Sequence, residues 1–205
     1  MSGERTGSAA HGRDAAGKAA AIADAARAGG KRGLPPVERW NPPYCGEIDM
    51  RIAWDGSWHY QGTPIGRPAL VRLFSTVLRK DPERYVLVTP VERVGIAVED
   101  VPFLAVEMRR DGEGAGQVLH FTTNLGDETT AGPEHPMRFV REAQGGYRPY
   151  VHVRGGLEAR LTRALYLEIV ALAEVEDIAG EAMLALRSGG AVFVIAPAAE
   201  LGEAW

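Results

Sequence analysis

Apolar and polar side chains alternate on both sides of Asp55-Gly56, a pattern that predicts a β-hairpin over residues 48–61. A two-residue turn would mix apolar and polar side chains on each face, which a sheet with one buried face does not tolerate. A three-residue loop, residues 54–56, with Gly56 in the left-handed region shifts the register by one position. We predict this second register because it gathers the apolar residues on one face: Ile48, Met50, Ile52, Trp58 and Tyr60.

The next segment has the period of an amphipathic helix, which we predict over residues 68–80. Pro68 suits the first helical turn, where its missing N–H is no loss. Arg79 and Lys80 would complement the negative end of the helix dipole before Asp81-Pro82 ends the helix. A short apolar strand over residues 85–89 is expected to follow. The apolar stripe consists of Leu70, Leu73, Phe74, Val77 and Leu78.

The second half of the chain repeats this order of elements. Thr162 is predicted to be the N-cap of a helix that ends near residue 173, with strands before and after it. Strand, glycine turn, helix and strand thus occur twice, which predicts an α+β fold of two small modules with mostly antiparallel sheets, each packed by one helix. The glycine-rich segment 109–117 is predicted to be a hairpin tip. The further predicted strands are 91–98, 103–108, 118–123, 137–141, 150–154, 157–161, 182–187 and 191–195.

Residues 1–33 differ from the rest because they are rich in Ala, Gly and Ser and contain no aromatic residue. They carry a net charge of +3 against −7 for residues 34–205. We predict a disordered tail over residues 1–33, an N-terminal module over 34–94 and a C-terminal module over 95–205. Within the tail, residues 19–28 could form a short helix with Ile22 as its only large apolar residue.

The composition excludes several classes of protein. A net charge of −4 offers no general attraction to a nucleic-acid polymer. No apolar run approaches the ~20 residues of a membrane span, and the N-terminus lacks the apolar core of a secretory signal, so we expect a cytoplasmic protein without membrane contact. The single cysteine, Cys45, excludes an internal disulfide and is expected to be buried. Neither a cofactor nor a metal is expected, because no dinucleotide, phosphate-loop or metal-ligand motif occurs.

Polar residues at predicted strand ends and in the long loop 124–136 are the candidates for ligand binding. Their carboxylates and amide could bind ribose or base groups, the histidine a phosphate, and the arginine at residue 154 an anion. Each also has an ordinary structural alternative in a turn or an ion pair. His59, His120 and His152 lack metal-ligand spacing and are predicted to be sheet-face residues. The candidates are Glu92, Arg93, Glu99, Asp100, Asn124, Asp127, His135 and Arg154.

Six motifs occur in order along the chain: WNPPYCGEIDMRI (40–52), GTPIGR (62–67), TPVE (89–92), VEDVPF (98–103), TNLGD (123–127) and YVHVRGGLE (150–158). Together they resemble the domain-of-unknown-function 1285 family. The resemblance covers about residues 34–195 and implies a bacterial protein with a duplicated core and a C-terminal domain superficially like pleckstrin-homology folds. It also implies a nucleotide-like ligand in the cleft between the domains and a role in signal transduction. It supplies no catalytic residues, and residues 175–183 lack the aromatic-rich strand expected there.

These features predict a non-catalytic sensor that binds a small anionic, nucleotide-like ligand between its modules, with a protein partner in signalling. Two alternatives stay open. One is a hydrolase or transferase that uses Glu92, Asp100, Asp127 or His135, although the chain has no G-x-S-x-G nucleophile motif. The other is a protein-interaction module that works through its sheet-and-helix surface.

Overall fold

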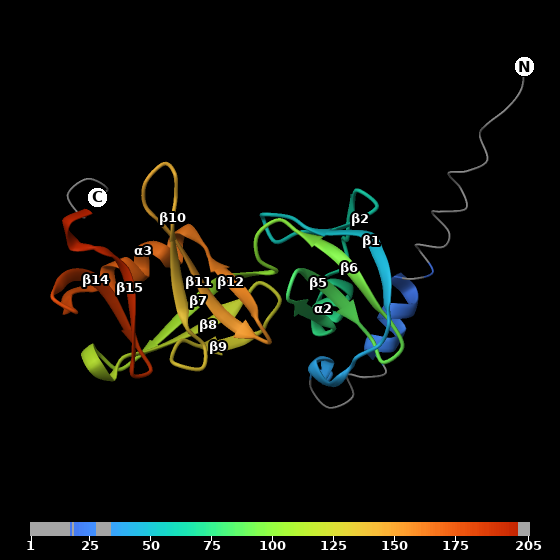
Figure 1. Cartoon of the computed structure of the whole chain (residues 1–205), viewed down its shortest axis with the longest axis horizontal. Coiled ribbons are helices and arrows are strands. Elements are labelled where there is room, and N and C mark those ends of the chain that lie inside the picture. The colour runs from blue at the N-terminus through green and yellow to red at the C-terminus, as the bar shows by residue number, and fades with distance from the viewer. Residues whose placement is uncertain (1–16, 18, 28–33, 201–205) are drawn as a thin grey trace, which may run out of the picture. The chain divides into compact units, whose positions relative to one another are not determined.

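The chain divides into two compact units, Met1–Asp100 and Val101–Trp205. The structure is a computed structural model that describes residues 17, 19–27 and 34–200 (Figure 1). The sequence predicted a boundary after residue 94, but the boundary lies after Asp100. The reason is that strand β6 (Arg93–Val98) pairs with two strands of the N-terminal unit and therefore belongs to it entirely.

The N-terminal unit contains a six-stranded sheet in the order β3-β2-β1-β6-β5-β4. Only β1 and β6 run parallel, and the other neighbours are antiparallel. A short 3-10 helix, η1 (Val37–Arg39), precedes the first strand. The remaining strands are β1 (Tyr44–Ile52), β2 (Trp58–Tyr60), β3 (Thr63–Pro64), β4 (Leu78–Asp81) and β5 (Arg84–Val88).

The hairpin of β1 and β2 has the predicted register. Met50 pairs with Tyr60, and Ile52 pairs with Trp58. The loop is closed by the amide of Gly56, which donates to the carbonyl of Ala53 at 2.9 Å, and Gly56 has a φ of +79°. One-sided burial selects this register, because Met50, Ile52 and Trp58 are all at most 2% exposed.

Helix α2 (Pro68–Thr76) is shorter than predicted. Arg79 and Lys80 do not end the helix but lie in β4, which forms an antiparallel hairpin with β5. Leu78 is fully buried in this strand, and Arg79 donates to the carbonyl oxygens of Val37 and Trp40. These contacts require an extended backbone, so tertiary pairing overrides the local helical period.

Residues 19–27 form an N-terminal helix that belongs to the first unit. Ile22, Ala23 and Ala26 are 0%, 3% and 1% exposed. The prediction of disorder is wrong for this segment, because one isoleucine and a face of alanines are enough to pack a short helix on the module. Residues 1–16, 18 and 28–33, on which the rest of that prediction falls, lie outside the described residues.

The C-terminal unit has a six-stranded sheet in the order β10-β11-β12-β7-β8-β9 and an antiparallel three-stranded sheet, β13-β14-β15. Only β12 and β7 run parallel. The elements are β7 (Phe103–Asp111), η2 (Gly114–Gly116), β8 (Val118–Thr123), β9 (Glu128–Thr130), β10 (Met137–Arg141), β11 (Tyr147–Arg154), β12 (Leu157–Leu161), α3 (Arg163–Leu172), β13 (Glu174–Ile178), β14 (Glu181–Ser188), β15 (Ala191–Pro197) and η3 (Ala198–Glu200).

Helix α3 begins as predicted. The hydroxyl of Thr162 accepts a hydrogen bond from the amide of Leu165, which satisfies one of the free donors of the first turn. Leu165 and Ile169 are the buried residues of the helix, and α3 contacts β7, β12 and β14. The helix therefore joins the two sheets of this unit.

Three local predictions need correction. The loop 124–136 contains the short strand β9, which pairs with β8. Strand β13 is present although it lacks aromatic residues. Cys45 is exposed rather than buried, with Sγ 3.6 Å from the carbonyl oxygen of Pro43. Short polar strands such as β9 form because a neighbouring strand offers a partner, which local periodicity does not report.

The two units repeat one order of elements. Three strands, a helix and three strands occur as β1-β2-β3-α2-β4-β5-β6 and again as β10-β11-β12-α3-β13-β14-β15. In the first copy β1 pairs with β6, and in the second copy β10 contacts β15. The predicted α+β fold with mostly antiparallel sheets and a duplicated module is confirmed. The likeness of the C-terminal unit to pleckstrin-homology folds stays a prediction.

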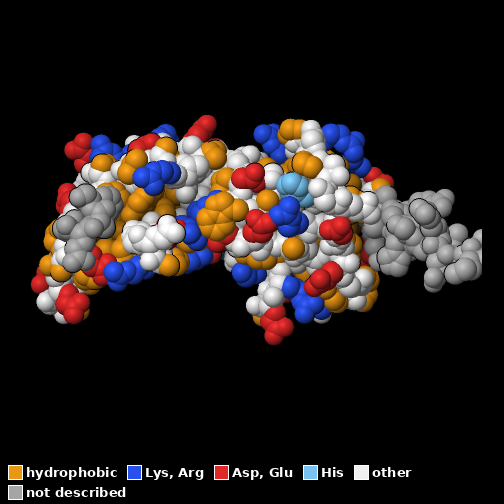
Figure 2. Space-filling model, turned by 90° about the horizontal axis from the view of Figure 1, so that it is seen from above, with side chains coloured by type: hydrophobic (Ala, Val, Ile, Leu, Met, Phe, Trp, Pro, Cys, Tyr) orange, Lys and Arg blue, Asp and Glu red, His pale blue; other side chains and the backbone are white. Residues whose placement is uncertain are grey.

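The surface carries both signs of charge. On the face of each unit seen in Figure 2, Lys and Arg side chains are interspersed with Asp and Glu side chains. Electrostatic recognition on this face therefore depends on local groups rather than on a field of one sign. Within the part of the chain that the structure describes, no helix combines the length and the apolar character needed to cross a membrane.

Candidate functional site

The residues predicted to bind a ligand fall in both units. Glu92, Arg93, Glu99 and the half-buried Asp100 belong to the N-terminal unit, where they lie beside or at the ends of β6. Asn124, Asp127, His135 and Arg154 belong to the C-terminal unit. Asp127 and His135 both contact side chains of β11, so the C-terminal group is the one that the fold brings together.

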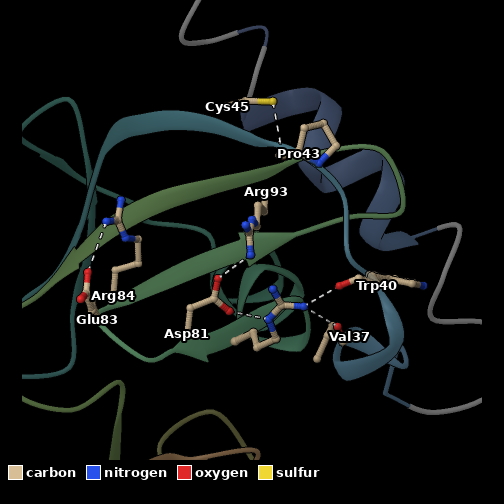
Figure 3. Close-up of polar contacts among 9 residues, drawn as sticks. Val37, Trp40, Pro43, Cys45, Asp81, Glu83, Arg84 and Arg93 are labelled. Carbon is tan, nitrogen blue, oxygen red and sulfur yellow. Dashed lines mark hydrogen bonds and ion pairs between the residues drawn. The ribbon is translucent and has the colours of Figure 1, made fainter.

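Arg93 has a structural role (Figure 3). Its Nη1 lies 2.9 Å from Oδ2 of Asp81, and Nε of Arg79 lies 2.8 Å from Oδ1 of the same carboxylate. Arg79 also donates to the carbonyl oxygens of Val37 at 2.9 Å and Trp40 at 2.6 Å. The network ties the segment before β1 to β4 and β6, so we assign Arg93 to the fold rather than to a ligand.

The two glutamates of this group close turns. The amide of Glu92 donates to the hydroxyl of Thr89 at 3.2 Å, directly before β6. Oε2 of Glu99 accepts from the amide of Trp54 at 2.7 Å, and Oε1 pairs with Arg51. The bond from Trp54, followed by that from Arg51, holds the pKa of Glu99 below its usual range. Glu99 thereby fastens the β1–β2 loop to the end of β6.

Two of the C-terminal candidates fix the long loop. Oδ1 of Asn124 accepts from the amide of Leu104 at 3.0 Å, and the amide of Asn124 donates to the carbonyl of Leu104 at 2.8 Å. Oδ1 of Asp127 lies 3.1 Å from Nε of Arg154, and these side chains are only 15% and 19% exposed. The guanidinium of Arg154 also lies over the ring of Phe103, 5.3 Å from its centre. The loop is therefore anchored at both ends of its first turn.

His135 forms a pair with His152. Their Nδ1 atoms are 3.1 Å apart, and their rings stack with centroids 5.1 Å apart at an interplanar angle of 28°. The amide of Gly156 donates to Nε2 of His152 at 3.3 Å. Nε2 of the neutral His152 ring is therefore an acceptor, which places its proton on Nδ1 and makes Nδ1 of His135 the acceptor within the pair. His135 then carries its own proton on Nε2.

Burial lowers the pKa of His152 below its ordinary value of 6.5, and the positive charge of His135 lowers it further. The carboxylate of Glu158 and the carbonyl of Glu134 oppose this shift in part. The two facing nitrogens share one proton, so protonation of both rings breaks their contact. The unfolded chain binds more protons than the folded chain between the lowered pKa and 6.5, so the free energy of unfolding decreases as the pH falls through that window.

We expect the pKa of His152 to rise when His135 is replaced by Asn, because the charge that disfavours its protonation is removed while its burial remains. An NMR titration of the imidazole resonances measures this change. His120→Asn is the matched control, since His120 bonds to Thr130 and Asp111 instead. An unchanged pKa of His152 in His135→Asn contradicts the pairing.

His135 also borders a polar hollow of about 600 Å³ over β7, β8 and β9. This volume lies within the range of small-molecule sites. The wall combines basic groups and hydroxyls with two carboxylates. Among the described residues, no group of three or more His, Cys, Asp and Glu side chains is arranged to hold a metal ion. The lining residues are Glu107, Met108, Arg109, His120, Phe121, Thr122, Glu128, Thr129, Thr130 and His135.

His120 lies in β8 and His152 in β11, as predicted for residues of a sheet, but neither side chain is isolated: His152 contacts His135, and His120 lines the hollow. The antiparallel register of β10 and β11 is the sequence signal that would have predicted the contact between His135 and His152. Met137 lies opposite Val151, and the amide of His152 donates to the carbonyl of Pro136 at 3.0 Å. Extending the antiparallel register by one or two residues brings His135 next to His152.

Two family models match the chain: Domain of unknown function (DUF1285), N-terminal domain, over residues 35–101, and Protein of unknown function (DUF1285), C-terminal domain, over residues 102–195. A DUF1285 family protein from Silicibacter pomeroyi DSS-3, solved at 2.50 Å, is 48% identical with a TM-score of 0.81, over 89% of this chain and 98% of that chain. Another from Shewanella baltica OS155, solved at 1.40 Å, is 28% identical with a TM-score of 0.48, over 60% and 91%. No curated protein matches. The chain therefore belongs to the DUF1285 family, as its motifs predict.

Proposed function

We propose that this protein is a non-catalytic sensor that binds a small anionic, nucleotide-like ligand and has a role in signal transduction. The observation that carries the proposal is the polar hollow of the C-terminal unit, with the paired His135 at its border. The sequence predicted a ligand between the modules. We place the ligand instead in this hollow, which the C-terminal unit forms by itself.

The groups around the hollow support an anionic ligand that also carries hydroxyls. Arg109 and His120 line it, although Arg109 is paired with Asp111 and His120 bonds to Thr130 and Asp111, and His135 offers Nε2–H as a donor. The carboxylates of Glu107 and Glu128 are acceptors for ribose hydroxyls. Phosphate donors and ribose acceptors therefore lie around one cavity.

The use of the candidate acids and bases supports binding rather than catalysis. Of the residues named for the hydrolase or transferase alternative, Asp127 is engaged by Arg154 and therefore serves the fold. Nδ1 of His135 faces another imidazole instead of a hydroxyl or thiol that it could activate. No observation on the described residues favours the hydrolase or transferase alternative over a sensor.

A panel of mono-, di- and cyclic nucleotides, with neutral nucleosides and inorganic phosphate for comparison, tests the proposal by calorimetry and thermal unfolding of the full chain. We expect at least one nucleotide to bind saturably and raise Tm, since a ligand at 100 times its Kd stabilises by about 2.7 kcal/mol. His135→Gln should weaken that binding about tenfold, as for one lost polar contact of about 1.4 kcal/mol.

Arg163→Gln, an exposed position of α3 in the same unit, is the control and should leave the affinity unchanged. No stabilisation by any nucleotide at saturating concentration would count against the sensor. Equal affinity in His135→Gln would count against the hollow as its site. Chromatography of each incubated nucleotide checks for turnover, and a product that disappears with His135→Gln would favour an enzyme.

A further inference from the structure

A separate pocket of about 490 Å³ lies in the N-terminal unit, beside the N-terminal helix. One side of its wall is made of small residues from that helix: Ala19, Ala20 and Ala23. The other side is apolar and comes from β1, the segment after β2, and α2. It includes Met50, Ile65, Leu70 and Phe74. The volume is within the range that holds a small organic molecule.

The alanine face of the helix explains why the pocket exists. Ala23 and Ala26 are almost fully buried, and Ile22 is the only large apolar side chain that the helix contributes. Small side chains leave space that protein interiors normally fill, and atoms facing such a space lose their dispersion contacts. An apolar body in the pocket would restore these contacts.

The wall of the pocket also contains polar groups. Arg67 lines it, and among the residues that the structure describes its guanidinium has no ion-pair or hydrogen-bond partner. The hydroxyl of Tyr60, another lining residue, is buried without a hydrogen-bond partner in the described part of the chain. Burial, more than the charge of Asp49, raises the pKa of this phenol, so it stays a donor at neutral pH. A buried donor without an acceptor is costly, and a ligand oxygen would satisfy it.

We propose that this pocket binds an amphiphilic anion, a carboxylate on an unbranched apolar chain. The chain packs among the alanines of the N-terminal helix, Leu70 and Phe74, the carboxylate pairs with Arg67, and Tyr60 donates to the ligand. Arg27 adds positive charge to the same wall, although it is itself paired with Asp24. The site shares no residue with the hollow of the C-terminal unit, so it stands independently of the proposed sensor function.

Decanoate, below its micelle-forming concentration, and the neutral decanol are the probes, titrated calorimetrically into the full chain. We expect one saturable site for decanoate, a concentration-dependent rise in Tm, and at least tenfold weaker binding of decanol because it lacks the charge that Arg67 recognises. Absence of saturable decanoate binding, or equal affinities for the two probes, overturns the proposal.

Variants locate the site. Arg67→Gln should weaken decanoate about tenfold and leave decanol unchanged, whereas Arg72→Gln, exposed on α2 outside the pocket wall, should change neither. Ala23→Leu fills the pocket from the helix. Gly66→Leu fills it from the opposite wall, at a position where a Cβ meets no atom within 4 Å, and both should abolish binding of both probes. Decanoate binding that survives Gly66→Leu and Arg67→Gln overturns the assignment even if Ala23→Leu does not fold.

Tyr60→Phe separates a ligand role from a structural role. Because the hydroxyl has no partner among the described residues, its removal should not lower the Tm of the unliganded protein. It should weaken decanoate several-fold, as expected for one lost hydrogen bond. A lower Tm with unchanged decanoate affinity would show that the hydroxyl serves the fold, and would contradict its part in the site.

Discussion

Arg79→Met is expected to lower the free energy of unfolding by about 3–5 kcal/mol, the range for breaking a buried ion pair by removing one partner. Arg79 is 7% exposed and supplies hydrogen bonds to the carboxylate of Asp81 and to the carbonyls of Val37 and Trp40. Methionine keeps much of the volume of the stem but removes all three hydrogen bonds, and among the described residues Asp81 is then paired with Arg93 alone. Urea denaturation followed by circular dichroism measures the loss.

Arg72→Met is the matched control, because Arg72 is exposed on α2 and belongs to no such network. Its effect should stay within about 0.5 kcal/mol. A loss below about 1 kcal/mol for Arg79→Met would mean that water replaces the guanidinium without penalty, and would contradict the structural role assigned to this network and to Arg93.

Trp58→Ala is expected to cost about 3–5 kcal/mol, as for other large aromatic side chains removed from a core. Trp58 is 2% exposed and stacks on Phe74 of α2 with ring centroids 6.4 Å apart at 16°. The substitution removes the contact that joins the sheet to the helix and leaves a cavity. Thermal and urea unfolding of the purified variant measure the loss.

Trp54→Ala is the matched control for Trp58→Ala, because it makes the same substitution at an exposed position of the same hairpin. Trp54 is 44% exposed in the loop, and the hydrogen bond from its backbone amide to Glu99 is retained in the substitution. We therefore expect less than half the loss seen for Trp58→Ala. Equal losses, or a larger one for Trp54, would indicate that the hairpin register differs by one residue from that of the structure.

Predictions that rested on local chemistry were confirmed. The register of β1 and β2 follows from the need to bury Met50, Ile52 and Trp58 together, a condition that neighbouring residues satisfy within one hairpin. Thr162 caps α3 because its hydroxyl reaches an amide three residues away. Both arguments involve groups that are close in sequence.

Predictions that needed distant partners were incomplete. The apolar period of α2 continues in the sequence past Thr76. Residues 78–81 nevertheless form a strand, because they pair with β5 and Arg79 bonds to a carbonyl of η1. The composition of the N-terminal helix gives little reason to expect burial, yet Ile22 is fully buried. In both cases a contact partner elsewhere in the chain outweighs a local preference of a few tenths of a kcal/mol per residue.

The candidate site shows the same division. Residue type alone made Asp127, His135 and Arg154 candidates, but it did not predict the ion pair between Asp127 and Arg154 or the contact of His135 with His152. Residue type also drew attention to Arg93 and Glu99, which the structure uses to hold its own loops. Polar residues at strand ends serve either purpose, and only their partners distinguish the two.

By itself, the amino-acid sequence determined the class of the fold, its duplication, most of its strands and its membership of the DUF1285 family. Only the tertiary structure decided which polar residues form structural contacts and which border the hollow at His135. It also decided that a pocket lies beside the N-terminal helix. The reason is physical: alternation and capping act over a few residues, whereas the partner of a charge or the filling of a cavity depends on strand order and packing between segments far apart in the chain.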